Sequence, residues 1–129
     1  APRHGVATGA SAASLDAMAP LVRAVPSRRG ESCVAACGRG NLTCVGALFA
    51  VVNTCPRLER AFDCKSCEVA AAGSAGRDMP CYVATDAPRS HPRGFCMVHP
   101  DAAKPSCEAT YQHTSRLCPC LHEEEMNAG

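Results

Sequence analysis

The stretch "RLCPC", Arg116 to Cys120, places two cysteines on either side of one proline near the end of the chain. Because the proline ring fixes its own φ angle, the two cysteines are held in a defined relative direction. Such a rigid pair can bind a metal ion, carry out a redox reaction or form two separate disulfides. The composition and the spacing of the other cysteines discriminate between these three hypotheses.

The composition predicts a fold that depends on disulfides. The chain has 129 residues, of which 11 are Cys and only three are Phe, and Ile and Trp are absent. So few large apolar side chains do not offset a backbone ordering cost of about 1–2 kcal/mol per residue. A cysteine content this high is typical of a small disulfide scaffold. The net charge of +1 gives no case for nucleic-acid binding.

The cysteines also predict the compartment. Disulfides persist where thiols are oxidised, so we expect a secretory lumen or the cell exterior, with the thylakoid lumen as the alternative. The sequence begins at Ala1, from which we expect either that a targeting segment has been removed or that the chain is a piece of something longer. The sequence contains no run of 18 or more apolar residues, so we predict no membrane span.

The chain divides into three predicted parts. Residues 1–31 are an N-terminal arm rich in Ala, Ser and Gly, residues 32–121 are a cysteine-rich domain, and residues 122–129 are an acidic polar tail. Within the arm, Ser14 could cap a short helix that Pro20 bends or interrupts. The apolar side of this helix would consist of Leu15, Met18, Leu21, Val22 and Val25. The arm is either mobile or lies along the surface of a partner.

The first half of the cysteine-rich part is predicted to be helical. Cys33 and Cys37, in "ESCVAAC", share one helix face, and their parallel directions predict that each bonds elsewhere. A second helix is predicted along "VGALFAVVN", and a third along "TCPRLERAFDC" with Thr54 as its cap and Pro56 in its first turn. The apolar sides of these two helices are Val45, Leu48, Phe49 and Val52, and then Cys55, Leu58 and Phe62.

The second half, residues 68–115, is predicted to consist of loops. "AAAGSAGRDMP" and "TDAPRSHPRG" are rich in turn residues, and loops this long need a restraint. The predicted fold class is therefore a small disulfide-rich domain with a few short α-helices followed by long stapled loops, and little or no β-sheet. We expect at least four disulfides. The disulfide candidates are Cys33, Cys37, Cys44, Cys55, Cys64, Cys67, Cys81, Cys96, Cys107, Cys118 and Cys120.

Zinc and redox chemistry fit these cysteines less well. Cys64 and Cys67 have the spacing of a zinc-ligand pair, but the "CPC" spacing is tighter than usual and seven other cysteines would have no role. The same "CKSC" has the form of a thiol oxidoreductase motif, yet no βαβ pattern surrounds it. Cys64 also follows a predicted helix C-terminus, where the helix dipole disfavours a thiolate.

No other chemistry is predicted for this chain. None of the five His stands in a recognisable nucleophile setting, and no Gly-rich phosphate loop follows a strand. We therefore predict a non-enzymatic chain with no catalytic residue, no cofactor and no metal. "CPC" is predicted to hold two disulfides at one point, with Pro119 setting the angle between them.

Two further features of the sequence are its odd number of cysteines and its two asparagine glycosylation motifs. Because 11 is odd, one cysteine is expected to be left over, as a buried thiol or as a bridge to a partner, and Cys55 and Cys67 are the candidates. "NLT" at Asn41 is an N-glycosylation sequon in a predicted exposed turn. Asn53, in the rarer "NTC" form, is expected to be inaccessible inside a helix.

Several short sequence elements follow one another along the chain in a recognisable order. They are "SCVAAC" at 32–37, "NLTC" with Leu42 and Cys44, Phe49 and Asn53, "FDC" at 62–64, "PCY" at 80–82, a spaced cysteine, and "TYQHTSRLCPC" at 110–120. This order resembles the cysteine-rich C-terminal module of the N-acetylglucosaminyltransferase V family, Golgi enzymes that build the β1,6 branch of N-glycans. The sequence has more cysteines than that module leads us to expect, with Cys55 and Cys67 as the additions.

The resemblance implies a setting rather than an activity. Catalysis in that family belongs to a larger two-lobed region upstream, which binds the nucleotide sugar and the acceptor, and no part of it is recognised here. The family implies a small disulfide-rich fold in a lumenal or extracellular setting. We expect a non-catalytic structural or docking subunit of a larger assembly, which could be membrane-bound, for example in a thylakoid. The chain would bind a protein partner, for which residues 1–31 are the candidate segment, or a glycan. The alternative is a fragment or divergent relative of a Golgi N-acetylglucosaminyltransferase whose catalytic region is missing.

Overall fold

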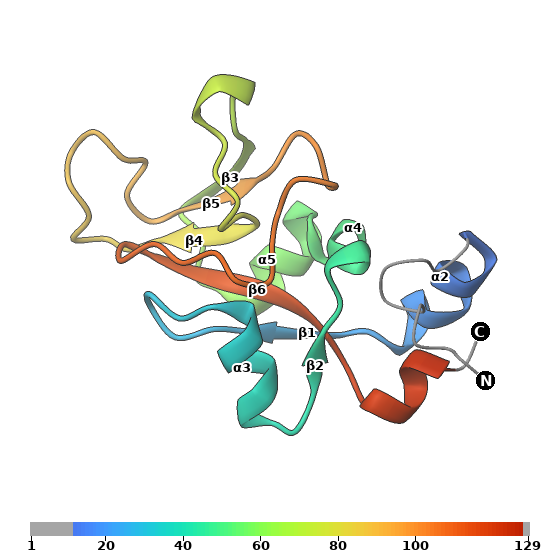
Figure 1. The fold of residues 1–129 in the computed structure, drawn as a ribbon. Coiled ribbons are helices and arrows are strands. Elements are labelled where there is room, and N and C mark those ends of the chain that lie inside the picture. The colour runs from blue at the N-terminus through green and yellow to red at the C-terminus, as the bar shows by residue number, and fades with distance from the viewer. Residues whose placement is uncertain (1–11, 128–129) are drawn as a thin grey trace.

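The strand that contains "RLCPC" is the centre of the fold. The structure is a computed structural model that describes residues 12–127. Strand β6 (Thr114–Leu121) pairs antiparallel with β1 (Arg23–Pro26) along one edge, and with β4 (Cys81–Val83) and then β2 (Thr43–Cys44) along the other (Figure 1). Pro119 lies opposite Ala24 of β1, at the point where β6 passes from β4 to β2. Proline has no backbone N–H to donate, but at this point β6 pairs with neither β4 nor β2. Pro119 therefore removes no backbone hydrogen bond between β6 and these two strands.

The expectation of little or no β-sheet is wrong. Beyond β4, the sheet continues with β5 (Phe95–Val98), which pairs antiparallel with β4, and β3 (Ser66–Val69), which pairs parallel with β5. The described residues thus form a six-stranded mixed sheet in the order β1-β6-β4-β5-β3, with β2 on β6. Three of these strands lie between residues 66 and 98, most of which the composition had predicted to be loops. Strands of two to four residues carry too few side chains to show a period-2 pattern.

The predicted helices of the first half are confirmed. Helix α3 (Cys33–Arg39) begins after Ser32, whose Oγ accepts from the Ala35 N–H. A short 3-10 turn, η3 (Gly46–Leu48), leads into α4 (Phe49–Val52), and α5 (Cys55–Ala61) has Thr54 as its cap. The apolar side predicted for the second pattern is buried, namely Val45, Leu48, Phe49 and Val52. Leu58 of α5 is buried in the same core.

The predicted short helix of the N-terminal segment is also present. Helix α2 (Ala12–Met18) gives way to the 3-10 turn η2 (Ala19–Leu21) at Pro20, and Met18 is fully buried. Two more 3-10 turns are η4 (Ala72–Ser74) and η5 (Glu123–Asn127). Helix α2 and η5 lie at the same end of the molecule (Figure 1).

The division at residues 31 and 121 stays a prediction, and parts of it lie outside the described residues. Residues 1–11 of the predicted arm and 128–129 of the predicted tail are not described. The described remainder of the arm contributes β1 to the sheet. An ion pair of 2.8 Å between Arg23 and Glu125 links this segment to the tail.

Candidate functional site

The "CPC" stretch joins α3 to β6 through two bridges. Cys33 bonds Cys118, and Cys37 bonds Cys120, with Cα–Cα distances of 5.3 and 5.5 Å. The spacing of one helical turn on α3 therefore matches the spacing of two residues on β6. This confirms that "CPC" holds two disulfides at one point and that Cys33 and Cys37 each bond elsewhere.

Three further bridges hold the rest of the chain. They join Cys44 to Cys107, Cys55 to Cys67, and Cys64 to Cys96. The five bridges exceed the predicted minimum of four and all lie between residues 33 and 120. Cys55 and Cys67 bond each other, so the expectation that one of them is left over is wrong. The free cysteine is Cys81, which is buried.

The sheet explains why Cys81 has no partner. Cross-strand register places Cys67, Cys96 and Tyr82 in one row, and this row faces α5, where Tyr82 stacks on Phe62 at 5.5 Å. Because side chains alternate between faces along a strand, the next row lies on the opposite face. That row is Glu68, Met97, Cys81 and Arg116. The sheet therefore separates the Cys81 thiol from the bridges that Cys67 and Cys96 make.

Arg116 fixes two loops to this second face. Its side chain is fully buried and donates to the backbone carbonyls of Arg77, Asp78 and Ala109 at 2.8–3.1 Å. Its guanidinium carbon also lies 5.4 Å from the centre of the Phe49 ring. Burial lowers the pKa of Arg116, while the negative charge of Asp78 acts in the opposite direction.

A cavity of about 500 Å³ lies on this second face of the sheet. Its floor is made of Met97, Cys81, Val83 and Thr114, which belong to β5, β4 and β6. Residues 70–79, which include the 3-10 turn η4, together with residues 90–92 and Tyr111, form the walls. The volume falls within the range of about 300–1,000 Å³ that is usual for small-molecule sites.

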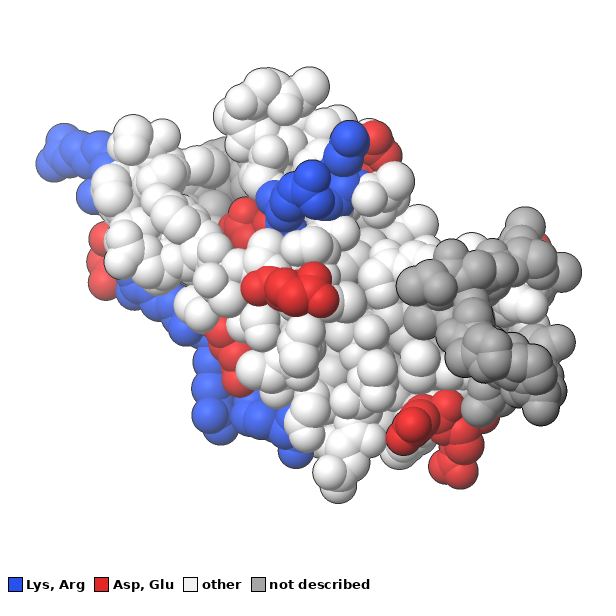
Figure 2. Space-filling model, in the orientation of Figure 1, with Lys and Arg blue, Asp and Glu red and all other residues white. Residues whose placement is uncertain are grey.

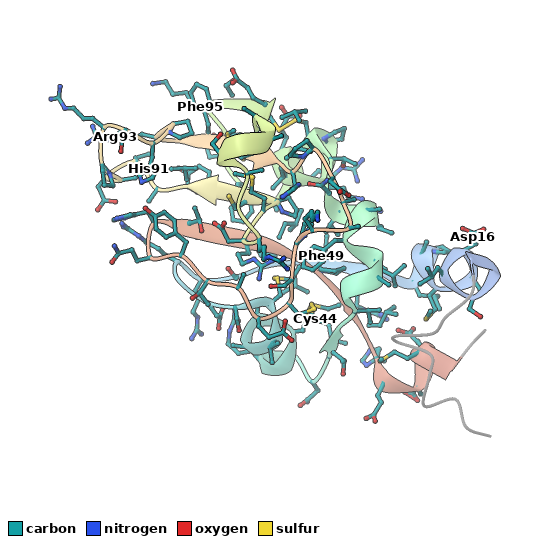
Figure 3. All side chains as sticks on the ribbon, turned by 45° about the horizontal axis from the view of Figure 1, so that its top comes forward. Asp16, Cys44, Phe49, His91, Arg93 and Phe95 are labelled. Carbon is teal, nitrogen blue, oxygen red and sulfur yellow. A yellow bond between two sulfur atoms is a disulfide. The ribbon has the colours of Figure 1, made fainter. Side chains whose placement is uncertain are left out.

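The polar groups of the cavity are held by hydrogen bonds. The Thr114 hydroxyl donates to the Asp78 carboxylate at 2.7 Å, and the Tyr111 hydroxyl lies 2.7 Å from His91 Nε2. Tyr111 also packs edge-on against the rings of His91 and His113, at 5.5 and 5.2 Å. His91 and its neighbours Arg93 and Phe95 lie at one end of the molecule, far from Asp16 at the other (Figure 3).

The Cys81 thiol is in its neutral form. Burial raises its pKa well above the ordinary value, and the nearby negative charge of Asp78 raises it further. A thiol with a raised pKa is a poor nucleophile and a poor redox centre. Cys81 therefore contributes shape and polarisability to the cavity floor.

The other sequence-predicted residues lie away from this cavity. Asn41 is exposed at the turn after α3, with a φ of 60°, and its glycosylation stays a prediction. Cys64 and Cys67 belong to two different disulfides, so neither is available for a zinc site or a redox centre. Among residues 12–127, no group of three or more His, Cys, Asp or Glu side chains could hold a metal ion. None of the helices in the same part has the length and apolarity that a bilayer crossing requires.

The comparison with protein families identifies the chain. The family model for glycosyltransferase family 18 matches residues 13–120, which include all five disulfides and the sheet up to Cys120. The chain belongs to glycosyltransferase family 18. The resemblance to the N-acetylglucosaminyltransferase V family is thereby confirmed. No curated protein matches the sequence.

The sequence did not predict the cavity of this family-18 chain. Asp78, Cys81, His91 and Tyr111 are scattered between residues 78 and 111 and meet only because β4 pairs with β5 and β6. The "TYQHTSRLCPC" stretch was singled out, and it contains Tyr111, Thr114 and Arg116. The isolated polar residues within that stretch were the available signal, but burial of an arginine cannot be inferred from its neighbours in sequence.

Proposed function

We propose that this chain is a non-catalytic, disulfide-stabilised module of a family-18 glycosyltransferase, and that it works in the secretory lumen. The observation that carries the proposal is the family match over residues 13–120, which coincides with the disulfide-bonded fold. Five disulfides require an oxidising compartment, and the secretory lumen is the one in which glycosyltransferases and disulfides occur together. The thylakoid lumen has no support from the family.

The contacts of the stretch "RLCPC" favour a structural role. Arg116 is occupied by backbone carbonyls, and both cysteines are occupied by bridges to α3. These residues hold the sheet, α3 and the loops together. They leave no nucleophile or general base in the stretch for sugar transfer.

The module's role is to dock onto the catalytic region of the enzyme. Figure 2 shows one face with an acidic group near its middle and basic groups above it, and with a largely uncharged area below and to the right of the middle. Charged residues are depleted at the centre of protein interfaces, so this uncharged area is suited to a protein partner. A module fixed by five bridges is preorganised, which lowers the entropy cost of association.

Co-secretion tests this proposal. The catalytic region of a family-18 enzyme that lacks its own cysteine-rich module is expressed in secretory cells with and without the chain. We expect a 1:1 complex by size exclusion with light scattering, and more secreted catalytic region. The chain alone should release no UDP from UDP-N-acetylglucosamine. UDP release by the chain alone, or no complex and no gain in secretion, would contradict the proposal.

Two cysteine variants provide a matched control. The double variant Cys37→Ser/Cys120→Ser removes one bridge between α3 and β6, and it should lose the complex. The variant Cys81→Ser removes the free thiol and leaves every bridge in place, so it should retain the complex.

A second candidate is a divergent or incomplete glycosyltransferase, whose activity depends on further sequence. The family match itself favours this candidate. It predicts that sugar transfer appears when the chain is joined covalently to the catalytic region, and that the two separate chains do not associate.

A further inference from the structure

The cavity exists because the composition leaves one face of the sheet thinly covered. On the other face, α5 and the disulfides of Cys67 and Cys96 fill the space. On the cavity face the buried cluster consists mainly of small side chains and two methionines: Ala70, Met79, Cys81, Val83, Ala87 and Met97. Small side chains at the end of a sheet leave a volume that the chain's own side chains do not fill.

The cavity combines apolar walls with hydrogen-bonding groups. Met79 and Met97 contribute flexible apolar side chains to the lining, and Tyr111 contributes an aromatic side chain. Carboxylates are present at Asp78 and Glu68, and hydroxyls line it at Ser74 and Ser90. Such convergent polar groups in an apolar cleft are the ordinary composition of a specific small-molecule site.

The charge of the cavity excludes phosphate-bearing ligands. The residues that line it include Asp78 and Glu68 but no Lys and no Arg. The Asp78 carboxylate is balanced by the buried guanidinium of Arg116, whose protonated form it favours. Glu68 is exposed at the rim, where water screens its charge. The interior is therefore close to neutral, which disfavours both a phosphate and a strongly cationic ligand.

From this combination we infer that the cavity binds one neutral sugar residue of a glycan. A pyranose ring has an apolar face that can pack on the methionines and on Tyr111. Its hydroxyls can donate to the Asp78 and Glu68 carboxylates and can exchange hydrogen bonds with His91. The inference deepens the proposed function, since a module without transfer chemistry contributes to a glycosyltransferase by holding a glycan beside the catalytic region.

The Cys81 thiol provides a direct measurement of occupancy. Ten of the 11 cysteines are in disulfides, which leaves Cys81 as the one free thiol. Because this thiol is buried and neutral, iodoacetamide alkylates it slowly, through local opening of the cavity face. Cys81 lines the cavity, so a bound sugar should hold this face closed and slow the alkylation further. The protection factor should be about 1 + [L]/Kd, which is about elevenfold when the sugar is at ten times its Kd.

The experiment follows alkylation of the native chain by mass spectrometry. Glucose, mannose and N-acetylglucosamine are each added up to about 100 mM, a range that detects affinities weaker than about 1 mM. Ethylammonium chloride and inorganic phosphate are added in parallel. We expect protection by at least one of the three sugars, with shifts of the Tyr111 and His91 NMR signals. Protection by ethylammonium or phosphate alone, or by none of the probes, would overturn the inference.

Two alanine variants separate cavity binding from general stabilisation. Ala71→Phe adds a ring at an exposed position that lines the cavity, whereas Ala50→Phe adds the same ring at the exposed position of α4, which does not line it. Sugar protection should be lost in the first variant and kept in the second. Equal protection in both would place the sugar elsewhere and refute the inference. The complex with the catalytic region is measured separately, so a failure here leaves the proposed function to be judged by its own experiment.

Discussion

Arg116 shows how one residue can hold several loops at once. Its planar guanidinium donates in three directions to carbonyls of segments that are 30 or more residues apart in sequence. A lysine has a single ammonium group and cannot reproduce this fork. The carbonyls of Arg77, Asp78 and Ala109 would then be left without one or more partners inside the protein.

Arg116→Lys should therefore destabilise the fold. Each buried carbonyl that loses its partner costs about 1–3 kcal/mol, so we expect a loss of at least about 2 kcal/mol in the free energy of unfolding. Chemical denaturation measures this loss. Arg89→Lys, at an exposed position, is the control and should change stability little. A loss of the same size in both variants would mean that the carbonyl contacts of Arg116 are not what stabilises the fold.

The two asparagine sequons should behave differently in secretory cells. Asn41 is exposed in a turn, and Thr43 of its sequon is also exposed on β2. The Asn53 amide instead donates to the His99 carbonyl and accepts from the His99 N–H, both at 2.9 Å. We expect one glycan, at Asn41, detected as a mass shift on glycosidase treatment. Asn41→Gln should abolish that shift, and a glycan found on Asn53 would contradict the prediction.

At the scale of elements, Glu31 joins the loop before α3 to the end of that helix. Its carboxylate accepts from Arg39 Nε and Nη2 at 2.9 and 2.8 Å, and from the Arg28 N–H at 2.8 Å. The Arg39 guanidinium is the main cause that lowers the pKa of Glu31 to about 2. Because the folded-state pKa lies below the ordinary value, this carboxylate stabilises the fold above about pH 4.5 and loses that effect as the pH falls toward 2.

Glu31→Gln should reveal this pH dependence. Since Arg39 is partly exposed, solvent screening limits the loss at pH 7 to about 1 kcal/mol. The difference between variant and parent should shrink between pH 4.5 and pH 2, as followed by thermal unfolding. Glu59→Gln, on the exposed side of α5, should show no such trend. A difference that stays constant down to pH 2 would show that the ion pair does not stabilise the fold.

Elements also divide into those that local sequence predicts and those that it does not. The helices were predictable because Thr54 caps α5 and because Val45, Leu48, Phe49 and Val52 follow the helical period. The spacing of Cys33 and Cys37 predicted that each bonds elsewhere, and "CPC" was predicted to hold two bridges, but that these four cysteines pair with one another was not predictable. The sheet could not be predicted, because Arg23 pairs with Cys120, almost a hundred residues away. The cavity and the free Cys81 follow from that sheet, so they were missed with it.

At the scale of the whole molecule, disulfides supply stability that a larger apolar core supplies in other proteins. Removing one bridge from a small domain costs typically about 2–5 kcal/mol, which is comparable to the entire stability of a domain. Full reduction should therefore unfold the chain at 37 °C, as seen by loss of the far-UV circular dichroism of its helices. The same spectrum with and without reductant would show that the core is stable alone. Cys81→Ser, which removes the free thiol and leaves all bridges in place, is the control for thiol chemistry.

The pairing of α3 with the last strand has a consequence for biosynthesis. Cys33 and Cys37 leave the ribosome 85 and 83 residues before their partners. At about 5–20 residues per second, they wait several seconds while Cys44, Cys55 and later cysteines emerge beside them. Native bridges at α3 can form only after Cys118 and Cys120 have been made, so wrong pairs formed in the meantime must be exchanged. The yield of correctly folded chain should therefore depend on the disulfide isomerase capacity of the cell, and a ribosome stalled before Cys118 would release a chain that cannot close its own sheet.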